Sequence, residues 1–110
     1  MSEIFFQWPG QRQSDLAHHR VAEFLVIDIQ RSPEWARDLL EKIQLVQSGN
    51  LPQWERIGNA FCLELSANGA TIDDLVDETI PAQTVSLEEL QKATIAWLEQ
   101  TEVLNNQDSK

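Results

Sequence analysis

The residues best suited to chemistry in this sequence are two adjacent histidines and one cysteine. His18 and His19 have acidic neighbours at Asp15 and Glu23. Adjacent residues in regular structure do not direct both rings at one metal ion, and a metal site needs three or four converging ligands. We therefore expect the histidines to lie in a solvated loop. A reactive thiolate at Cys62 would need a nearby cation or a helix N-terminus, which an acidic chain disfavours.

Motifs for other chemistry are also missing. The sequence contains no nucleophile elbow, phosphate-binding glycine loop or dinucleotide fingerprint. No nucleophile and base can be paired from two histidines and one strand cysteine. The sequence therefore predicts a protein that is not an enzyme and that uses no metal and no cofactor.

A second group of candidates is the acidic run Asp73, Asp74, Asp77 and Glu78. Its spacing lacks the twelve-residue ligand pattern and central glycine of a calcium loop. No second carboxylate motif supports acid-base hydrolysis. One interpretation is a solvated negative patch at the end of a hairpin. The functional interpretation is a docking surface for Lys and Arg side chains of a basic partner.

Three more residues complete the predicted partner-binding site. Glu88 and Glu89 add carboxylates in the same acidic half of the chain, and Trp8 is assigned as an aromatic anchor. Aromatic residues that fill a pocket on the partner often dominate binding energy. The predicted site therefore combines acidic side chains with one indole.

The overall charge favours a protein partner over a nucleic acid or a membrane. The chain has 18 acids and 8 bases, a net charge of −10. Such a chain repels phosphate backbones and anionic lipid surfaces, whereas it attracts a basic protein. The acids concentrate after residue 56, where only Lys92 and Lys110 oppose them. The sequence thus predicts no direct nucleic-acid binding and no membrane association.

Length and cysteine content limit the fold and the location. A chain of 110 residues suits one domain with one core. We predict a single domain over residues 1–104 and a frayed polar tail over 105–110. The single cysteine excludes an internal disulfide, and the first ten residues lack the basic and apolar regions of a signal peptide. These features predict a cytoplasmic protein.

The elements that position these residues follow from the apolar pattern. Residues 3–8 are aromatic and β-branched and end at Pro9-Gly10, which predicts a strand followed by a loop. Residues 21–30 are apolar at both odd and even positions, which predicts a central strand. Helix signals then predict a helix over 33–48: Ser32 as cap, Pro33 at the first position and Gly49 as the stop.

The second half predicts a hairpin and a closing helix. Asn68-Gly69 favours a type I′ turn between strands at about 61–66 and 70–76. The stretch "ETIPAQTV" is expected to be a loop with one short edge strand. Ser86 and Glu89 form a capping box ahead of a helix over about 87–102. The element order β-β-α-β-β-(β)-α predicts an α+β fold: an antiparallel sheet of four to five strands with two helices packed on one face.

The stretch around Gly58 predicts packing more than ligand binding. Trp54 and Phe61 serve one core only if an extra residue is absorbed between them, and Gly58 suits a bulge or a tight bend. Trp54 is then expected to anchor the core at the hairpin entry. Arg56 is expected to stack over an indole or to pair with a carboxylate.

The same stretch carries a family resemblance. The residues WERIG at Trp54–Gly58, followed by Phe61, Leu63 and the Asn68-Gly69 turn, resemble the pattern of the YacL-like family of small acidic bacterial proteins. The resemblance covers residues 54–76. It implies a cytosolic protein of uncharacterised housekeeping function, and the family has no established catalytic residue to transfer.

Three classes of function remain open from the sequence. The one we predict is an immunity or antitoxin type of inhibitor that occludes a basic toxin such as a nuclease. Its size and charge resemble those of contact-dependent growth-inhibition immunity proteins. The alternative is a YacL-like protein, which could be a homodimer through a sheet edge or a tryptophan-bearing helix face. An enzyme with an unrecognised site ranks last.

Overall fold

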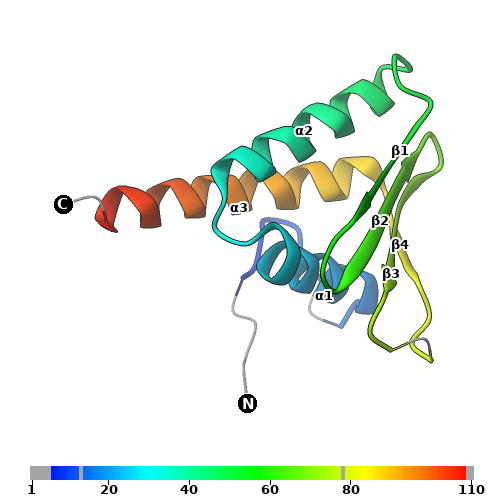
Figure 1. The fold of residues 1–110 in the computed structure, drawn as a ribbon, viewed down its shortest axis with the longest axis horizontal. Helices are drawn as coiled ribbons and strands as arrows, with labels where there is room; N and C mark the ends of the chain where they lie inside the picture. Colours follow the sequence, from blue (N-terminus) through cyan, green and yellow to red (C-terminus); the bar gives the residue numbers. More distant parts are fainter. Residues whose placement is uncertain (1–5, 13, 78, 109–110) are drawn as a thin grey trace.

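The computed structural model describes residues 6–12, 14–77 and 79–108, with side chains described up to residue 102 (Figure 1). The elements in chain order are α1 (Leu16–Phe24), a π-helical turn (Leu25–Ile29), α2 (Pro33–Gln47), β1 (Gln53–Ile57), β2 (Phe61–Ser66), β3 (Gly69–Asp74), β4 (Gln83–Val85) and α3 (Leu87–Asp108). The α+β class is therefore confirmed.

The sheet is antiparallel and follows the chain, in the order β1-β2-β3-β4. Residues opposite one another share a face, so Trp54, Leu65, Ala70 and Val85 form one row across all four strands. The sheet has four strands, within the predicted four to five. The element order differs from the prediction, because both predicted strands before α2 are missing from the described residues.

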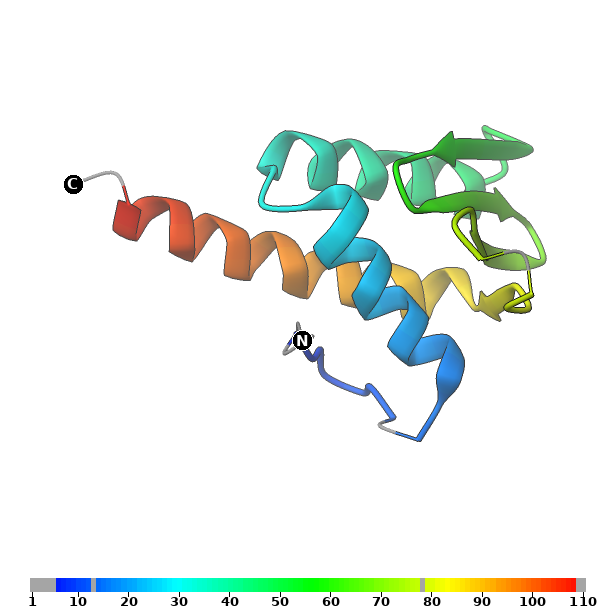
Figure 2. The ribbon, with the colours of Figure 1, turned by 60° about the horizontal axis from the view of Figure 1, so that its bottom comes forward.

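All three α-helices pack on one face of the sheet and leave the other face open (Figures 1 and 2). The core forms between that inner face and the helices. Its buried side chains come from the N-terminal segment, each α-helix, the π-helical turn and the inner face of the sheet. They include Phe6, Phe24, Leu25, Ile29, Leu39, Ile43, Leu63, Leu65, Ile72, Leu90 and Trp97.

The prediction of a strand over residues 21–30 is wrong, because this segment is helical. Its buried residues Val21, Ala22, Leu25 and Ile29 recur at helical spacing. A short apolar run does not by itself distinguish a buried strand from a buried helix. Asp15 is the missed start signal: its side chain accepts hydrogen bonds from the first N–H groups of α1.

The predicted N-terminal strand is also not observed in its described part. Residues 6–8 have no strand partner, and residues 3–5 lie outside the described residues. Phe6 and Trp8 are buried against the helices, with the Phe6 ring 4.9 Å from the Trp97 ring in an edge-on arrangement. Aromatic content here reflects helix packing and not strand pairing.

The other two helices follow their predicted signals. Ser32 accepts a hydrogen bond from the Trp35 N–H, Pro33 opens α2, and Gly49 has a φ of 82° after the helix. In α3 the Ser86–Glu89 capping box is formed in both directions. This helix continues to Asp108 instead of ending near 102, so residues 105–108 of the predicted frayed tail are helical.

The Asn68-Gly69 signal marks a real hairpin with a different geometry. The β2–β3 turn is centred on Ala67 and Asn68, because Ser66 pairs with Gly69. Only Gly69 has a positive φ there, so the predicted type I′ turn is wrong. Of the two alternatives predicted for Gly58, the tight bend is confirmed: Gly58 begins the bend between β1 and β2, and its N–H donates to the Phe61 carbonyl at 2.9 Å.

The reason for glycine at position 58 is a buried carboxylate. Asp28, 2% exposed, extends from the π-helical turn and accepts hydrogen bonds from the Ala60 and Phe61 N–H groups, both at 3.0 Å. A Cβ on Gly58 would lie 2.7 Å from the Asp28 Cγ and 2.7 Å from a guanidinium nitrogen of Arg56. The π-helical turn therefore holds the β1–β2 bend in place through Asp28.

The junction after the π-helical turn is strained. Gln30 has φ 60° and ψ −159°, a region used almost only by glycine. Its carbonyl accepts a hydrogen bond from the Trp97 indole N–H at 2.7 Å. Packing of α3 thus stabilises an unfavourable backbone conformation that turns the chain from the first helical segment into α2.

Candidate functional site

Among the described residues, no helix covers the face of the sheet that points away from the three α-helices (Figures 1 and 2). Alternation along each strand places one set of side chains on it. These are Gln53, Glu55, Ile57, Cys62, Glu64, Ser66, Thr71, Asp73 and Thr84. We call these residues the outer face. None of them is basic.

Three carboxylates dominate the outer face. Glu55 and Glu64 are directly opposite one another on β1 and β2, and Asp73 is opposite Cys62 on β3. All three carboxylate residues are exposed, and among the described residues no ion pair engages them. Like charges directly opposite one another on a sheet destabilise it. The fold therefore tolerates a repulsive pair that a cation from outside would neutralise.

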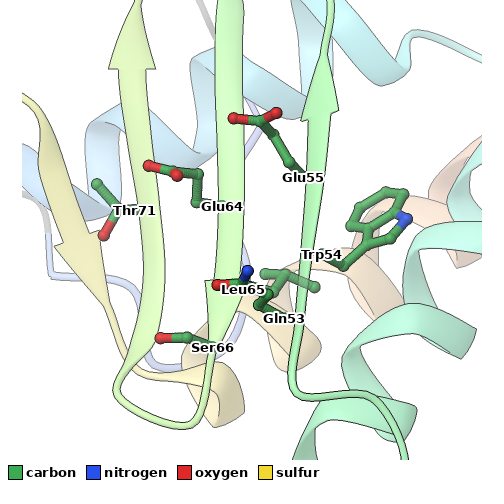
Figure 3. A pocket seen from close by; sticks show the side chains of 7 residues that line it. All are labelled: Gln53, Trp54, Glu55, Glu64, Leu65, Ser66 and Thr71. Carbon is green, nitrogen blue, oxygen red and sulfur yellow. The ribbon is translucent and has the colours of Figure 1, made fainter.

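A shallow depression of about 580 Å³ lies across β1, β2 and β3 on this side. Figure 3 shows the Glu55 carboxylate over β2 and the Glu64 carboxylate between β2 and β3, beside Thr71. Trp54 points the other way, toward α2. The depression thus offers acidic and hydroxyl groups to a ligand. The Trp54 indole lies on the opposite side of the sheet, which faces the core.

The pKa of the Cys62 thiol is raised by burial and by the negative charges of the outer face. Burial raises its pKa to about 11, helped by a hydrogen bond to Glu55 and by the charges of Glu55, Glu64 and Asp73. The thiol is therefore protonated at neutral pH. This agrees with the expectation of an unreactive cysteine.

A groove of about 310 Å³ borders the outer face at the β1 edge, between β1 and α2. It is lined by Trp35, Asp38, Leu39, Trp54, Arg56 and Ile57. The Trp35 indole is 48% exposed and the Ile57 side chain 71% exposed. The Arg56 guanidinium lies 5.3 Å from the Trp35 ring centre, which confirms the predicted stacking over an indole.

The predicted acidic run is divided between the outer face and a loop. Asp73 lies on the outer face. Asp74 accepts hydrogen bonds from the N–H groups of Val76 and Asp77. Asp77 accepts from Thr79, whose hydroxyl and backbone N–H lower the Asp77 pKa. Asp74 and Asp77 therefore help to build the loop after β3. Glu78 lies outside the described residues.

The remaining predicted site residues do not join Asp73. Glu88 is exposed at the start of α3, beside the Asn68-Gly69 turn and at the opposite end of β3 from Asp74. Trp8 is 5% exposed, with its ring 5.3 Å from the His18 ring, so it is not available as a surface anchor.

Glu89 is engaged with a histidine that was expected in a solvated loop. His18 is 1% exposed, which overturns that expectation. Its Nδ1 accepts the Arg12 backbone N–H at 2.9 Å, so its Nε2 carries the proton that is donated to Glu89 at 2.8 Å. This pair ties the segment before α1 to the first turn of α3.

Glu89→Gln should weaken the pH dependence of stability. The hydrogen bond from the Ser86 backbone N–H has the largest effect on Glu89 and lowers its pKa; burial opposes this effect, and the hydrogen bond and charge of His18 add to the lowering. A lowered folded-state pKa gives stability that is complete above the ordinary glutamate value and is lost as pH falls through the lowered pKa. We expect the wild type and Glu89→Gln to differ in free energy of unfolding near pH 6 and to converge near pH 3.

Chemical denaturation at a series of pH values measures this difference. Glu88→Gln is the matched control, because the Glu88 carboxylate is exposed and forms none of the hydrogen bonds that Glu89 forms. A gap between wild type and Glu89→Gln that stays constant from pH 6 to pH 3 would refute the assigned role of Glu89.

Glu55 and Glu64 are functional candidates that sequence reasoning missed. The signal was present: Glu64 alternates with the apolar residues Leu63 and Leu65, which places it on the solvent side of a half-buried strand. Glu55 required the β1–β2 register, in which it is opposite Glu64. The distance of 9 residues between them in the chain concealed their pairing.

The described residues contain no group of three His, Cys, Asp or Glu side chains placed to hold a metal ion. In the same part of the chain, none of the helices combines the length and hydropathy that a membrane span requires. Comparisons of this chain with models of known protein families, with curated proteins and with solved structures find no match.

Proposed function

We propose that this protein is a non-catalytic acidic binding domain that inhibits a basic toxin, such as a nuclease, by occluding it. It would act in the cytoplasm in the manner of an immunity protein or antitoxin. The observation that carries the proposal is the outer face, where Glu55, Glu64 and Asp73 are exposed without a cationic partner among the described residues. The net charge of −10 adds long-range attraction for a basic protein.

The binding site in this proposal differs from the acidic run in the sequence. Carboxylates on a rigid sheet are better oriented than those on a loop, and a fixed array loses little freedom on binding. Asp74 and Asp77 already accept hydrogen bonds within their loop. We therefore assign the central contacts to the outer face and a peripheral electrostatic role to the loop.

The alternative is a YacL-like cytosolic protein that self-associates. The exposed indole of Trp35 next to Ile57 favours this alternative, since exposed apolar patches often mark interfaces. Glu55 and Glu64 are both negatively charged, so the outer faces of two copies would repel one another.

Affinity capture from the native lysate, at low and high salt, tests the proposed function. The baits are the wild type, the outer-face variant Glu55→Gln/Glu64→Gln/Asp73→Asn, and a control variant Glu34→Gln/Glu41→Gln/Glu99→Gln. Both variants remove three exposed charges, the control from α2 and α3. We expect a basic protein that is retained by the wild type and the control and lost by the outer-face variant and at high salt.

The purified captured protein then completes the test. Its toxic activity should be inhibited at equal molar amounts by the wild type, and at least tenfold more outer-face variant should be required, a change of about 1.4 kcal/mol. Equal loss of capture by both variants would reduce the effect to net charge and contradict the assigned site. Recovery of only the bait would favour the self-associating alternative.

A further inference from the structure

The β1 strand has an unpaired edge. β1 is the first strand in the sheet order, and it pairs only with β2 among the described strands. Hydrogen-bonded and non-hydrogen-bonded pairs alternate along an antiparallel ladder. The Gly58 N–H donates to Phe61, which makes their pair a hydrogen-bonded one. The alternation then directs the N–H and C=O groups of Gln53, Glu55 and Ile57 away from β2.

Those outward backbone groups can accept another strand. An added strand extends the sheet by main-chain hydrogen bonds, and its alternate side chains fall on the two faces. On one side they would meet the outer face, beginning with Glu55 and then Glu64. On the other side they would meet the groove between β1 and α2, where the Trp35 indole is exposed.

Charge determines which strand fits. A second copy of β1 paired about Glu55 would place two Glu55 side chains together next to the existing Glu55–Glu64 pair, so self-pairing is repulsive. Lysine or arginine at those positions would instead neutralise the carboxylates. In the groove, the guanidinium of Arg56 is stacked on Trp35, and the carboxylate of Asp38 is already paired with Lys42. The Arg56 cation disfavours basic side chains on the groove side, whereas the Trp35 indole accommodates apolar ones.

We propose that β1 binds an extended segment of a partner protein by strand addition, and that this segment alternates basic with apolar residues. Its basic residues lie over Glu55 and Glu64, and its apolar residues pack in the groove against Trp35. This inference rests on the proposed function, because it names the part of the basic partner that occupies the outer face. It adds a main-chain component that the proposed function does not require.

Binding of a peptide of alternating lysine and valine, labelled at its N-terminus and followed by fluorescence anisotropy, tests this inference. The first control peptide has the same composition in scrambled order. The second has the same sequence with N-methyl groups on the amides that would face β1. We expect the scrambled and the N-methylated peptides each to bind at least tenfold more weakly than the parent peptide.

A protein variant gives the reciprocal test. Proline is tolerated at an edge position whose N–H points to solvent, so Ile57→Pro removes an outward donor without removing a β1–β2 hydrogen bond. Ile57→Thr, which keeps the donor, is the control. We expect Ile57→Pro to weaken binding at least tenfold beyond Ile57→Thr. The N-methylated peptide keeps the inference testable if Ile57→Pro does not fold.

The outcomes separate this inference from the proposed function. Equal binding of the parent and N-methylated peptides overturns strand addition. If that binding is still lost in the outer-face variant, the proposed function survives as a purely electrostatic contact. Failure of the parent peptide to bind at low salt also overturns strand addition, while lysate capture continues to decide the proposed function.

Discussion

Asp28→Ala should lower the free energy of unfolding by about 3 kcal/mol, because it leaves two backbone N–H groups of the β1–β2 bend without a partner. The carboxylate is 2% exposed and bonds the Ala60 and Phe61 N–H groups at 3.0 Å. Charge-assisted bonds of this kind are stronger than neutral ones. Asp28→Asn keeps one acceptor oxygen, so we expect a smaller loss.

Gly58→Ala should produce a similar loss through the same carboxylate. The added Cβ would occupy space that Asp28 and the Arg56 guanidinium now fill. Displacing Asp28 would break both of its bonds to the bend, whereas displacing the end of Arg56 is less costly. Urea denaturation of Gly58→Ala, with Asn59→Ala as the exposed neighbouring control, measures the loss.

The double variant Asp28→Ala/Gly58→Ala makes this test specific. Once the carboxylate has been removed, the added methyl group has space, so the second substitution should cost much less than it does alone. Additive losses in the double-mutant cycle would mean that Gly58 is required for another reason.

Trp97→Ala should lower the free energy of unfolding by about 3–5 kcal/mol, the range for a buried aromatic residue. Trp97 is 5% exposed, contacts the Phe6 ring and donates its indole N–H to the carbonyl of the strained Gln30. Trp97→Phe keeps much of the apolar contact and removes the donor, so its loss should fall between that of Trp97→Ala and the wild type.

Trp35→Ala is the matched control for Trp97. The Trp35 indole is 48% exposed and packs mainly with Arg56, so we expect a loss below about 1 kcal/mol. Denaturant unfolding followed by circular dichroism avoids dependence on the tryptophan signal. Equal losses of free energy of unfolding for Trp35→Ala and Trp97→Ala would contradict the view that Trp97 packing and its hydrogen bond to Gln30 hold α3 in place.

Local signals in the sequence identified the fold from residue 32 onward. Helix α2 has its cap, its proline and its glycine stop within a few residues of each end, and these interactions form inside the segment itself. The capping box at Ser86 gave the start of α3 for the same reason. The short edge strand expected within residues 78–85 is also confirmed, as β4.

The segment before residue 32 is stabilised by contacts with residues far away in the chain, and the sequence does not show such contacts. The helical segment Leu16–Ile29 is buried by the sheet, α3 and the N-terminal segment, so its apolar residues do not form one simple stripe. The role of Asp28 depends on a bend more than 30 residues later in the chain. The burial of His18 likewise depends on Glu89, 71 residues away.

In the candidate site, too, some features could be predicted from the sequence and others depend on contacts between distant residues. Acid content predicted an acidic surface, and Asp73 lies on the acidic outer face. The sequence could not show that Glu55 and Glu64 are opposite one another, since pairing of strands is decided by the bend at Gly58. It also could not show that Trp8 is buried while Trp35 is exposed.

Mapping the bound basic peptide by backbone amide NMR would test the central claim most directly. If the outer face and the β1 edge form the site, the alternating lysine peptide should shift the amide signals of Gln53, Glu55 and Ile57 and slow their exchange with solvent. Shifts confined to residues 74–77 and 79, with β1 unchanged, would place the acidic contact on the loop and contradict the account.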